Sequence, residues 1–277
     1  MNKRTIIITG ATGGIGKELS MHFAKQQSFN LVLLATNKTK LKELLQRIIK
    51  NFKNIDVHYY DVNLAKEDDV KQTFQKIITK FNTIDILINN AAISGPVGSI
   101  ESLNLDTYKA TIDVNLYGAI HCITESLEVM KPNKRGKIIN ICGAGVGWNA
   151  TAIEKSAYTT SKYALYGLSE SLSRELMEYD IDINCISPGS YDTKLRDALV
   201  SEAQKNNSTQ DLNDVSKTIG NLINFLISKD ANGLSGKIFS SIYDKPDDLL
   251  DNMQEIKNSS DYTIRKIDNI NFKRIGE

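Results

Sequence analysis

Tyr158 and Lys162 are the two side chains in this sequence whose types and spacing best suit proton transfer. They lie near the start of a long helical pattern, and residues four apart share one face of a helix. A phenol with an ordinary pKa near ~10 is a poor acid–base catalyst at neutral pH. An adjacent ammonium favours the phenolate, so we expect Lys162 to lower the pKa of Tyr158. The phenol could then exchange a proton with a carbonyl or alcohol oxygen.

A glycine-rich segment at residues 9–16 follows the first apolar run and leads directly into a helical pattern. Residues without a Cβ allow a tight turn, a close approach of backbone N–H groups to a pyrophosphate, and close packing of the helix on the strand. The helix N-terminus adds a partial positive charge. The alternative is an ordinary tight strand–helix turn, but the cluster opens the first βαβ unit, which favours dinucleotide binding. The residues expected to surround the phosphates are Gly10, Thr12, Gly13, Gly14, Ile15 and Gly16.

The elements that must position these residues follow from the alternation of short apolar runs and amphipathic stretches. The run Ile86-Leu87-Ile88 is apolar on both faces, which is typical of a parallel sheet covered by helices on each side. We expect strands at residues 5–9, 30–35, 55–60, 84–89, 137–142, 181–187 and 236–241. We expect helices at residues 15–26, 38–50, 66–80, 106–130, 156–179 and 214–228.

This order predicts an α/β fold, a doubly wound parallel sheet of the Rossmann type with about seven strands and helices on both faces. We assign residues 1–244 to one dinucleotide-binding catalytic domain and residues 245–277 to a C-terminal polar extension. The polar residues 192–213 are predicted to form a lid or insertion near the substrate.

The spacing of Tyr158 and Lys162 is common on ordinary helix surfaces, but its place after the fifth strand of such a fold favours catalysis.

The residues after the second strand bear on the choice of dinucleotide. An acid here would bond the ribose 2′-hydroxyl of NAD, whereas a basic residue would accept the 2′-phosphate of NADP. The sequence reads Thr36-Asn37-Lys38, with no acid to repel a phosphate. Lys38 could also be an ordinary solvated residue of a first helical turn. We therefore predict NADP as the cofactor, with NAD as the alternative.

Charge and composition exclude several other classes of protein. The chain has 34 basic and 33 acidic residues and a net charge of +1, so it has no field to attract nucleic acid or an anionic membrane. Three cysteines form no disulfide framework, and three scattered histidines suggest no metal site. The first residues match neither a signal peptide nor a spanning helix, so we expect a cytoplasmic protein.

Taken together, the chain resembles the main branch of the short-chain dehydrogenase/reductase family. The resemblance covers about residues 5–241, and its motifs occur in the family's order. It implies an NAD(P)-dependent oxidoreductase that interconverts a carbonyl and an alcohol by hydride transfer. The matching motifs are residues 9–16, Asp61-Val62, Asn89-Asn90-Ala91-Ala92, Asn115, Tyr158 with Lys162, and Pro188-Gly189 followed by Thr193.

The resemblance also implies roles for the residues that bind the adenosine half of the cofactor. Asp61, followed by Val62, is similar to the acid that contacts the adenine ring, although it could be only a turn residue. Asn89 corresponds to an asparagine that steadies the central sheet. Ala91 would lie beside the adenosine ribose.

Further roles are implied around the nicotinamide. Asn115 resembles a helix asparagine whose backbone carbonyl holds a water that links Lys162 to solvent, although it could be an ordinary polar residue. Lys162 would also bond the nicotinamide ribose. The residues implied to border the nicotinamide and its carboxamide are Pro188, Gly189 and Thr193.

One position departs from the family's pattern. The family usually has a serine at the end of the fifth strand, where it bonds the substrate oxygen, but no serine occurs between Cys142 and Lys155. Cys142 is the nearest equivalent in sequence, although a thiol is a weak donor and could simply be a small buried group. Thr151 could supply a hydroxyl instead. Trp148 and Tyr191 are placed where substrate-binding side chains are expected.

Two functions remain open from the sequence. The first is NADPH-dependent reduction of a small-molecule carbonyl, and a loose resemblance of the chain's ending to a polysaccharide-biosynthesis subgroup suggests a sugar or nucleotide-sugar. The second is a catalytically weak or inactive dinucleotide-binding regulator, which the missing serine favours. The family resemblance implies a homodimer or homotetramer.

Overall fold

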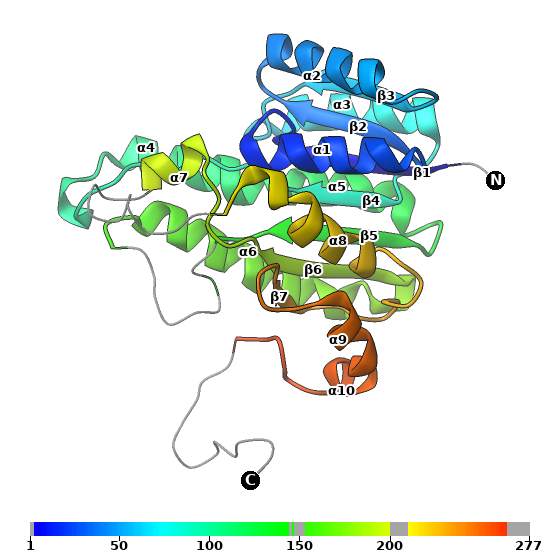
Figure 1. Ribbon diagram of the computed structural model, residues 1–277. Helices are drawn as coiled ribbons and strands as arrows, with labels where there is room; N and C mark the ends of the chain where they lie inside the picture. The colour runs from blue at the N-terminus through cyan, green and yellow to red at the C-terminus, as the bar shows by residue number, and fades with distance from the viewer. Residues whose placement is uncertain (1–2, 144–145, 147–152, 200–209, 265–277) are drawn as a thin grey trace.

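The structure is a computed structural model, and it describes residues 3–143, 146, 153–199 and 210–264. Seven parallel strands form one twisted sheet in the order β3-β2-β1-β4-β5-β6-β7 (Figure 1). This confirms the predicted doubly wound sheet. The strands are β1 (Arg4–Thr9), β2 (Phe29–Ala35), β3 (Asp56–Asp61), β4 (Ile86–Asn89), β5 (Gly136–Ile141), β6 (Ile181–Ser187) and β7 (Ile238–Ser240).

Successive residues of each buried strand point to opposite faces of the sheet. Both faces therefore present apolar side chains, and a layer of helices covers each face. Ile6 and Ile8 of β1 belong to one hydrophobic cluster, and Ile7 belongs to another. The first cluster includes side chains from α1 (Gly14–Gln26), α2 (Lys38–Asn51) and α8 (Asn221–Leu226). The second includes side chains from α3 (Glu67–Phe81) and α5 (Gly118–Met130) and lies on the other face.

The order of strands reverses direction between β1 and β4. In doubly wound sheets, ligands bind in the crevice beyond the carboxyl ends of the strands at such a point. The carboxyl ends lie on the left in Figure 1, on the side where α4 (Leu105–Ile112) and α7 (Lys194–Leu199) are found. The fold therefore places the segment after β1, which contains the glycines, at the edge where a ligand is expected.

The long helix expected at residues 106–130 is interrupted. It consists of α4, a π-helical turn at Asp113–Tyr117, and α5. Such turns insert one extra residue into a helix and often occur at functional sites. The amphipathic pattern continues through the turn, which explains why the sequence alone predicted one continuous helix.

The C-terminal extension packs against the domain over the part that the structure describes. Its helices α9 (Pro246–Asp251) and α10 (Met253–Asn258) bury Leu249, Met253 and Ile256 in the first hydrophobic cluster. The backbone N–H of Ile238 in β7 donates to the carbonyl of Tyr262 at 2.8 Å. This stretch of the extension therefore covers the outer strand of the sheet, and residue 244 stays a predicted boundary.

Across the described part of the chain, no helix combines the length and apolar character needed to cross a membrane. No cluster of three or more His, Cys, Asp or Glu side chains among the same residues is arranged to hold a metal ion.

Candidate active site

The turn after β1 presents bare backbone at the start of α1. Gly10 has a φ of +62°, and a Cβ at this position would lie 2.7 Å from the Cα of Ala91. Gly13 is the N-cap of α1, and no described side chain caps this helix. The first N–H groups of a helix have no partner within it. They suit an anion here, because the first turn of α1 also contains no acidic residue.

Close packing also explains the last glycine of the cluster. A Cβ at Gly16 would lie 2.2 Å from the carbonyl oxygen of Gly10 and 2.6 Å from the Nδ2 of Asn90. Neither atom can move freely, because Asn90 Nδ2 donates to the carbonyl of Thr9 at 3.0 Å. Only glycine fits between the turn and the helix at this point.

The variant Gly16→Ala is expected to lower the free energy of unfolding by about 3 kcal/mol and to abolish dinucleotide binding, because the added methyl displaces the turn. Gly167→Ala is the matched control, since a Cβ there meets nothing within 4 Å on an exposed position of α6 (Ser156–Glu175). We expect that control to stabilise the protein by about 0.5–1 kcal/mol. Urea unfolding and calorimetric titration with NADPH measure both quantities. Unimpaired binding in Gly16→Ala would contradict this account of the turn.

The ends of β2 and β3 come together beside the glycine turn. Lys38 Nζ lies 3.6 Å from Asp61 Oδ1, and both side chains are about half exposed. Asn37 accepts a hydrogen bond from the N–H of Lys40 and so caps α2, while Thr36 is exposed. The N–H of Val62, which is buried, donates to the carbonyl of Ala35 at 3.0 Å.

The segment after β4 is tied to the end of β1. The hydroxyl of Thr9 accepts hydrogen bonds from the N–H groups of Asn90 and Ala91, both at 3.0 Å. Asn89 is buried and donates from Nδ2 to Asn140 Oδ1 at 2.9 Å, which joins β4 to β5. These bonds bring Ala91 beside the turn, where Ala91 was predicted to border the adenosine ribose.

Tyr158 and Lys162 lie on one face of α6, as their spacing predicts. Lys162 is 2% exposed, and its Nζ donates to the carbonyl of Ile141 at 2.8 Å. The same Nζ lies 5.9 Å from the centre of the Tyr158 ring. The end of β5 thereby holds the ammonium close to the phenol.

The predicted lowering of the Tyr158 pKa is wrong for this structure. Burial raises the pKa of the Tyr158 phenol above its ordinary value. Burial also lowers the pKa of the Lys162 ammonium. The physical reason is that desolvation opposes the charged form of each group, and the ammonium is directed at the Ile141 carbonyl. Burial therefore favours the neutral form of the phenol.

Asn115 occupies the π-helical turn and connects two segments of the site. Its Oδ1 accepts from the N–H of Ile93 at 2.8 Å, and its Nδ2 donates to the carbonyl of Ile93 at 2.9 Å. Nδ2 also lies 3.1 Å from the hydroxyl of Ser161, the residue before Lys162. The side chain thus fixes the segment after β4 against α6, a connection that the sequence did not reveal.

The residue beside the phenol at the end of β5 is Gly143. A Cβ on Gly143 would lie 3.1 Å from Tyr158 Cε1 and 3.5 Å from its hydroxyl oxygen. Cys142 is 1% exposed and belongs to a buried cluster that also contains Cys185. Contact with Cys142 contributes, after burial, to the raised pKa of Cys185. The sequence pointed to Gly143 only through its place directly after Cys142. The packing shows that Gly143 is the position that lies against the Tyr158 ring.

The segment after β6 lies over the glycine turn. A Cβ at Gly14 would lie 2.6 Å from Thr193 Cγ2, which places Thr193 beside the start of α1. Gly189 has a φ of +79°, and the carbonyl of Pro188 accepts from the Ser241 hydroxyl at 2.8 Å. Tyr191 is only 2% exposed, and its hydroxyl bonds Thr218.

The structure therefore brings the predicted cofactor residues together around the carboxyl edge of the sheet. Trp148 and Thr151, which were predicted to contact substrate, lie outside the described residues. The fold and this site define a Rossmann-type protein with a tyrosine–lysine pair at the ligand-binding edge.

Comparisons with known proteins give the family. A family model described as short chain dehydrogenase matches residues 4–204. The (+)-borneol dehydrogenase 2 of Salvia officinalis is 30% identical over 248 residues, which are 84% of this chain and 86% of that protein. The 3-oxoacyl-(acyl-carrier-protein) reductase FabG of Staphylococcus aureus is 28% identical over 208 residues, which are 75% of this chain and 82% of the reductase. The chain belongs to the short-chain dehydrogenase/reductase family of oxidoreductases.

Solved structures agree on the fold. A structure of ElxO with NADP bound has a TM-score of 0.74 at 25% identity, covering 86% of this chain and 96% of ElxO. A structure of NAD+-bound xylitol dehydrogenase has a TM-score of 0.75 at 24% identity, covering 86% of this chain and 97% of that one. These proteins do not bear on the looser resemblance to a polysaccharide-biosynthesis subgroup, which stays a prediction.

Proposed function

We propose that this protein reduces a small-molecule carbonyl to an alcohol with NADPH. The observation that carries the proposal is the position of Tyr158 and Lys162 on α6, at the same edge of the sheet as the glycine turn. The relatives support the general reaction, since a borneol dehydrogenase and a 3-oxoacyl reductase are named for alcohol–carbonyl interconversion. Their different substrates leave the substrate of this chain to experiment.

The residues at the turn fit a dinucleotide. The uncapped N-terminus of α1 would hold the pyrophosphate, Asp61 and Val62 would border the adenine, and Ala91 would lie near the adenosine ribose. Lys162 would bond the nicotinamide ribose. Pro188, Gly189 and Thr193 would border the carboxamide. A bound nicotinamide supplies the hydride, and the protein supplies position and proton.

Tyr158 would be the proton donor in the reduction. Because burial raises its pKa, the phenol keeps its proton and can donate it to a carbonyl oxygen that gains charge as hydride arrives. The Lys162 ammonium would stabilise the phenolate that remains. Asn115 holds the segment after β4 against Ser161 and so positions this end of α6.

The preference for NADPH rests on Lys38. Its ammonium is half exposed at the end of β2 and is paired with Asp61 across a distance of 3.6 Å. The variant Lys38→Gln is expected to weaken NADPH binding about tenfold and to leave NADH binding unchanged, because only NADPH has a 2′-phosphate. Lys42→Gln is the control, since Lys42 is another exposed lysine of α2. Fluorescence titrations measure both affinities, and equal losses for both cofactors would refute the assignment.

The proposed activity is tested by following NADPH oxidation with a panel of cyclic ketones, 3-oxoacyl thioesters and keto-sugars. Turnover that depends on Tyr158 supports the reductase. Tight NADPH binding without turnover of any class would favour the second candidate, a weak or inactive dinucleotide-binding regulator, which the lack of a hydroxyl at Gly143 supports. We include a cytoplasmic homodimer or homotetramer in the proposal, and a monomer mass by light scattering would argue against that part.

A further inference from the structure

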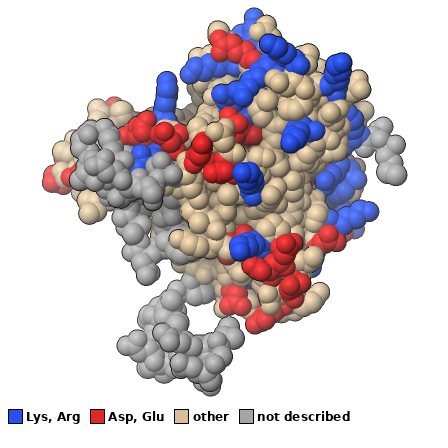
Figure 2. Space-filling model, in the orientation of Figure 1, with Lys and Arg blue, Asp and Glu red and all other residues tan. Residues whose placement is uncertain are grey.

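A cavity of about 840 Å³ opens at the amino edge of the sheet. Its lining includes Arg4 of β1, Asp85 just before β4, Lys137 of β5 and Asp182 of β6. Basic side chains gather on the right-hand side of Figure 2, the side on which β1 begins in Figure 1. The glycine turn and Tyr158 lie at the opposite, carboxyl edge of the same strands. The cavity is therefore separate from the candidate active site.

The two buried acids of the cavity already have partners. Asp85 is 3% exposed, accepts from the N–H of Thr5 at 2.8 Å, and pairs with Arg135 at 2.5 Å. Asp182 is 7% exposed and accepts from Lys137 Nζ at 2.6 Å. Each of these carboxylates therefore already has one cation as a direct partner.

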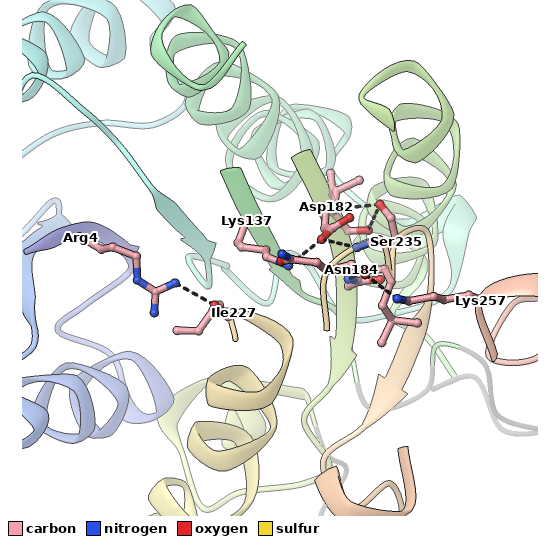
Figure 3. Close-up of polar contacts among 11 residues, drawn as sticks. Arg4, Lys137, Asp182, Asn184, Ile227, Ser235 and Lys257 are labelled. Carbon is pink, nitrogen blue, oxygen red and sulfur yellow. Dashed lines mark hydrogen bonds and ion pairs between the residues drawn. The ribbon is translucent and has the colours of Figure 1, made fainter. Parts of the chain in front are cut away.

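Several cations of the cavity lack such a partner. Arg4, Lys134 and Lys229 pair with no carboxylate in the described ranges. Arg4 uses one guanidinium N–H to bond the carbonyl of Ile227 at 2.8 Å, as Figure 3 shows. Five basic and three acidic side chains line the cavity, so two positive charges are in excess.

The excess of positive charge in the cavity is unfavourable around Arg4. Burial lowers the pKa of Arg4; Asp85 opposes this effect, while the nearby Arg135 adds to it. One carboxylate cannot fully neutralise two guanidinium groups. An anion placed between Arg4 and the neighbouring lysines would relieve this repulsion.

Ser228 gives an independent sign of a ligand. Its hydroxyl oxygen is buried and has no hydrogen-bond partner among the described residues, and Ser228 is one of the residues that line the cavity. Buried hydroxyl groups normally have a partner, because leaving one unbonded costs free energy. A rotation of the Ser228 side chain toward the cavity would let this hydroxyl donate to a ligand with acceptor oxygens.

One wall of the cavity is already fixed. It is the loop at residues 229–235, between α8 and β7. Asn184 Nδ2 donates to the carbonyl of Leu234 at 2.6 Å, and Lys257 Nζ donates to the carbonyl of Asn232 at 2.5 Å (Figure 3). The N–H of Gly233 donates to Asp182 Oδ2 at 3.1 Å. Small-molecule sites are usually preformed in this way.

We propose that this cavity binds a small organic dianion, a phosphate monoester or a dicarboxylate, at a second site distinct from the catalytic one. Arg4 offers planar donors for two oxygens, and the Ser228 hydroxyl donates once its side chain rotates toward the cavity. Lys134 and Lys229 balance the remaining negative charge. The site goes beyond the proposed reductase activity, and binding to it does not depend on that activity.

Calorimetric titration of the full chain with glycerol 3-phosphate and with succinate, at constant ionic strength, tests the site. We expect saturable binding of at least one probe, retained in excess NADPH, and none of uncharged glycerol. The probe that binds tighter identifies the anionic group. Arg4→Gln is expected to weaken binding about tenfold, because a charge-assisted hydrogen bond is lost. Ser228→Ala should weaken binding without destabilising the free protein.

A charge-matched pair of double variants keeps the test decisive if Arg4→Gln fails to fold. Lys134→Gln with Lys229→Gln removes two exposed cations of the cavity, whereas Lys42→Gln with Lys50→Gln removes two exposed cations of α2. Only the first pair should weaken binding, about fivefold. Equal weakening by both pairs, displacement of the probe by NADPH, or no saturable binding of either probe would overturn the proposal.

Discussion

Tyr158→Phe is expected to reduce kcat/KM for carbonyl reduction by about 10³-fold, since general acid catalysis typically contributes 10²–10⁴-fold. The substitution removes only the hydroxyl and keeps the ring that lies 5.9 Å from Lys162 Nζ. The carbonyl oxygen then has no proton donor as it becomes negative. The dissociation constant of NADPH should change little, because the phenol is not needed to hold the dinucleotide. Steady-state kinetics and fluorescence titration measure the two quantities separately.

Tyr108→Phe is the matched control for this substitution. The Tyr108 hydroxyl donates to the Thr160 hydroxyl on α6 at 3.2 Å, in a solvent-exposed hydrogen bond. Its loss removes one weak surface hydrogen bond, so kcat/KM should be nearly that of the wild type. If Tyr158→Phe retained full activity, or if both variants lost activity equally, Tyr158 would not be the proton donor.

Gly143→Ser is expected to raise kcat by about 10²-fold. Removing one donor to a developing oxyanion typically slows catalysis by ~10²–10³-fold, and this variant would add such a donor. A Cβ at Gly143 lies 3.5 Å from the Tyr158 hydroxyl oxygen, so a serine hydroxyl there can reach the same substrate oxygen. The Cβ also approaches Tyr158 Cε1 to 3.1 Å, which the ring can accommodate by a small shift. Single-turnover measurements with saturating NADPH would isolate the chemical step.

Gly143→Ala and Cys142→Ser separate the possible causes of such a gain. The alanine adds the same Cβ without a hydroxyl, so it should not raise kcat. Cys142 is 1% exposed in the cluster with Cys185, and we expect Cys142→Ser to leave kcat nearly unchanged. A gain in Cys142→Ser but not in Gly143→Ser would instead assign the substrate-orienting role to Cys142.

If Gly143→Ser does raise kcat, the natural enzyme works with Tyr158 as the main donor to the substrate oxygen. A substrate with its own hydroxyl beside the carbonyl could then compensate for the missing group. The site, which has few hydrogen-bond donors of its own, would then favour substrates that supply a hydroxyl. The keto-sugars in the substrate panel test that connection directly.

Much of the site was predictable because it depends on residues that are close in sequence. The pairing of Tyr158 with Lys162 follows from helix geometry, and the glycine turn follows from the need for bare backbone between a strand and a helix. Apolar runs such as Ile86-Leu87-Ile88 indicated strands covered on both faces. The parallel sheet then placed the carboxyl ends of its strands, and the motifs that follow them, at one edge.

Other features were decided only by contacts between segments far apart in the chain. The pKa of Tyr158 is raised, not lowered, because folding removes water from the phenol and directs Lys162 toward Ile141. Packing of β5 against α6 places Gly143 against the Tyr158 ring, and Cys142 is buried near Cys185 while its thiol still interacts electrostatically with Tyr158. Helical periodicity continues across the π-helical turn, so the sequence pattern alone does not indicate the turn. Only the hydrogen bonds of Asn115 to Ile93 and Ser161 show that this turn connects the segment after β4 to α6. Local sequence determined which groups are present, whereas desolvation and long-range packing determined their charge state and their neighbours.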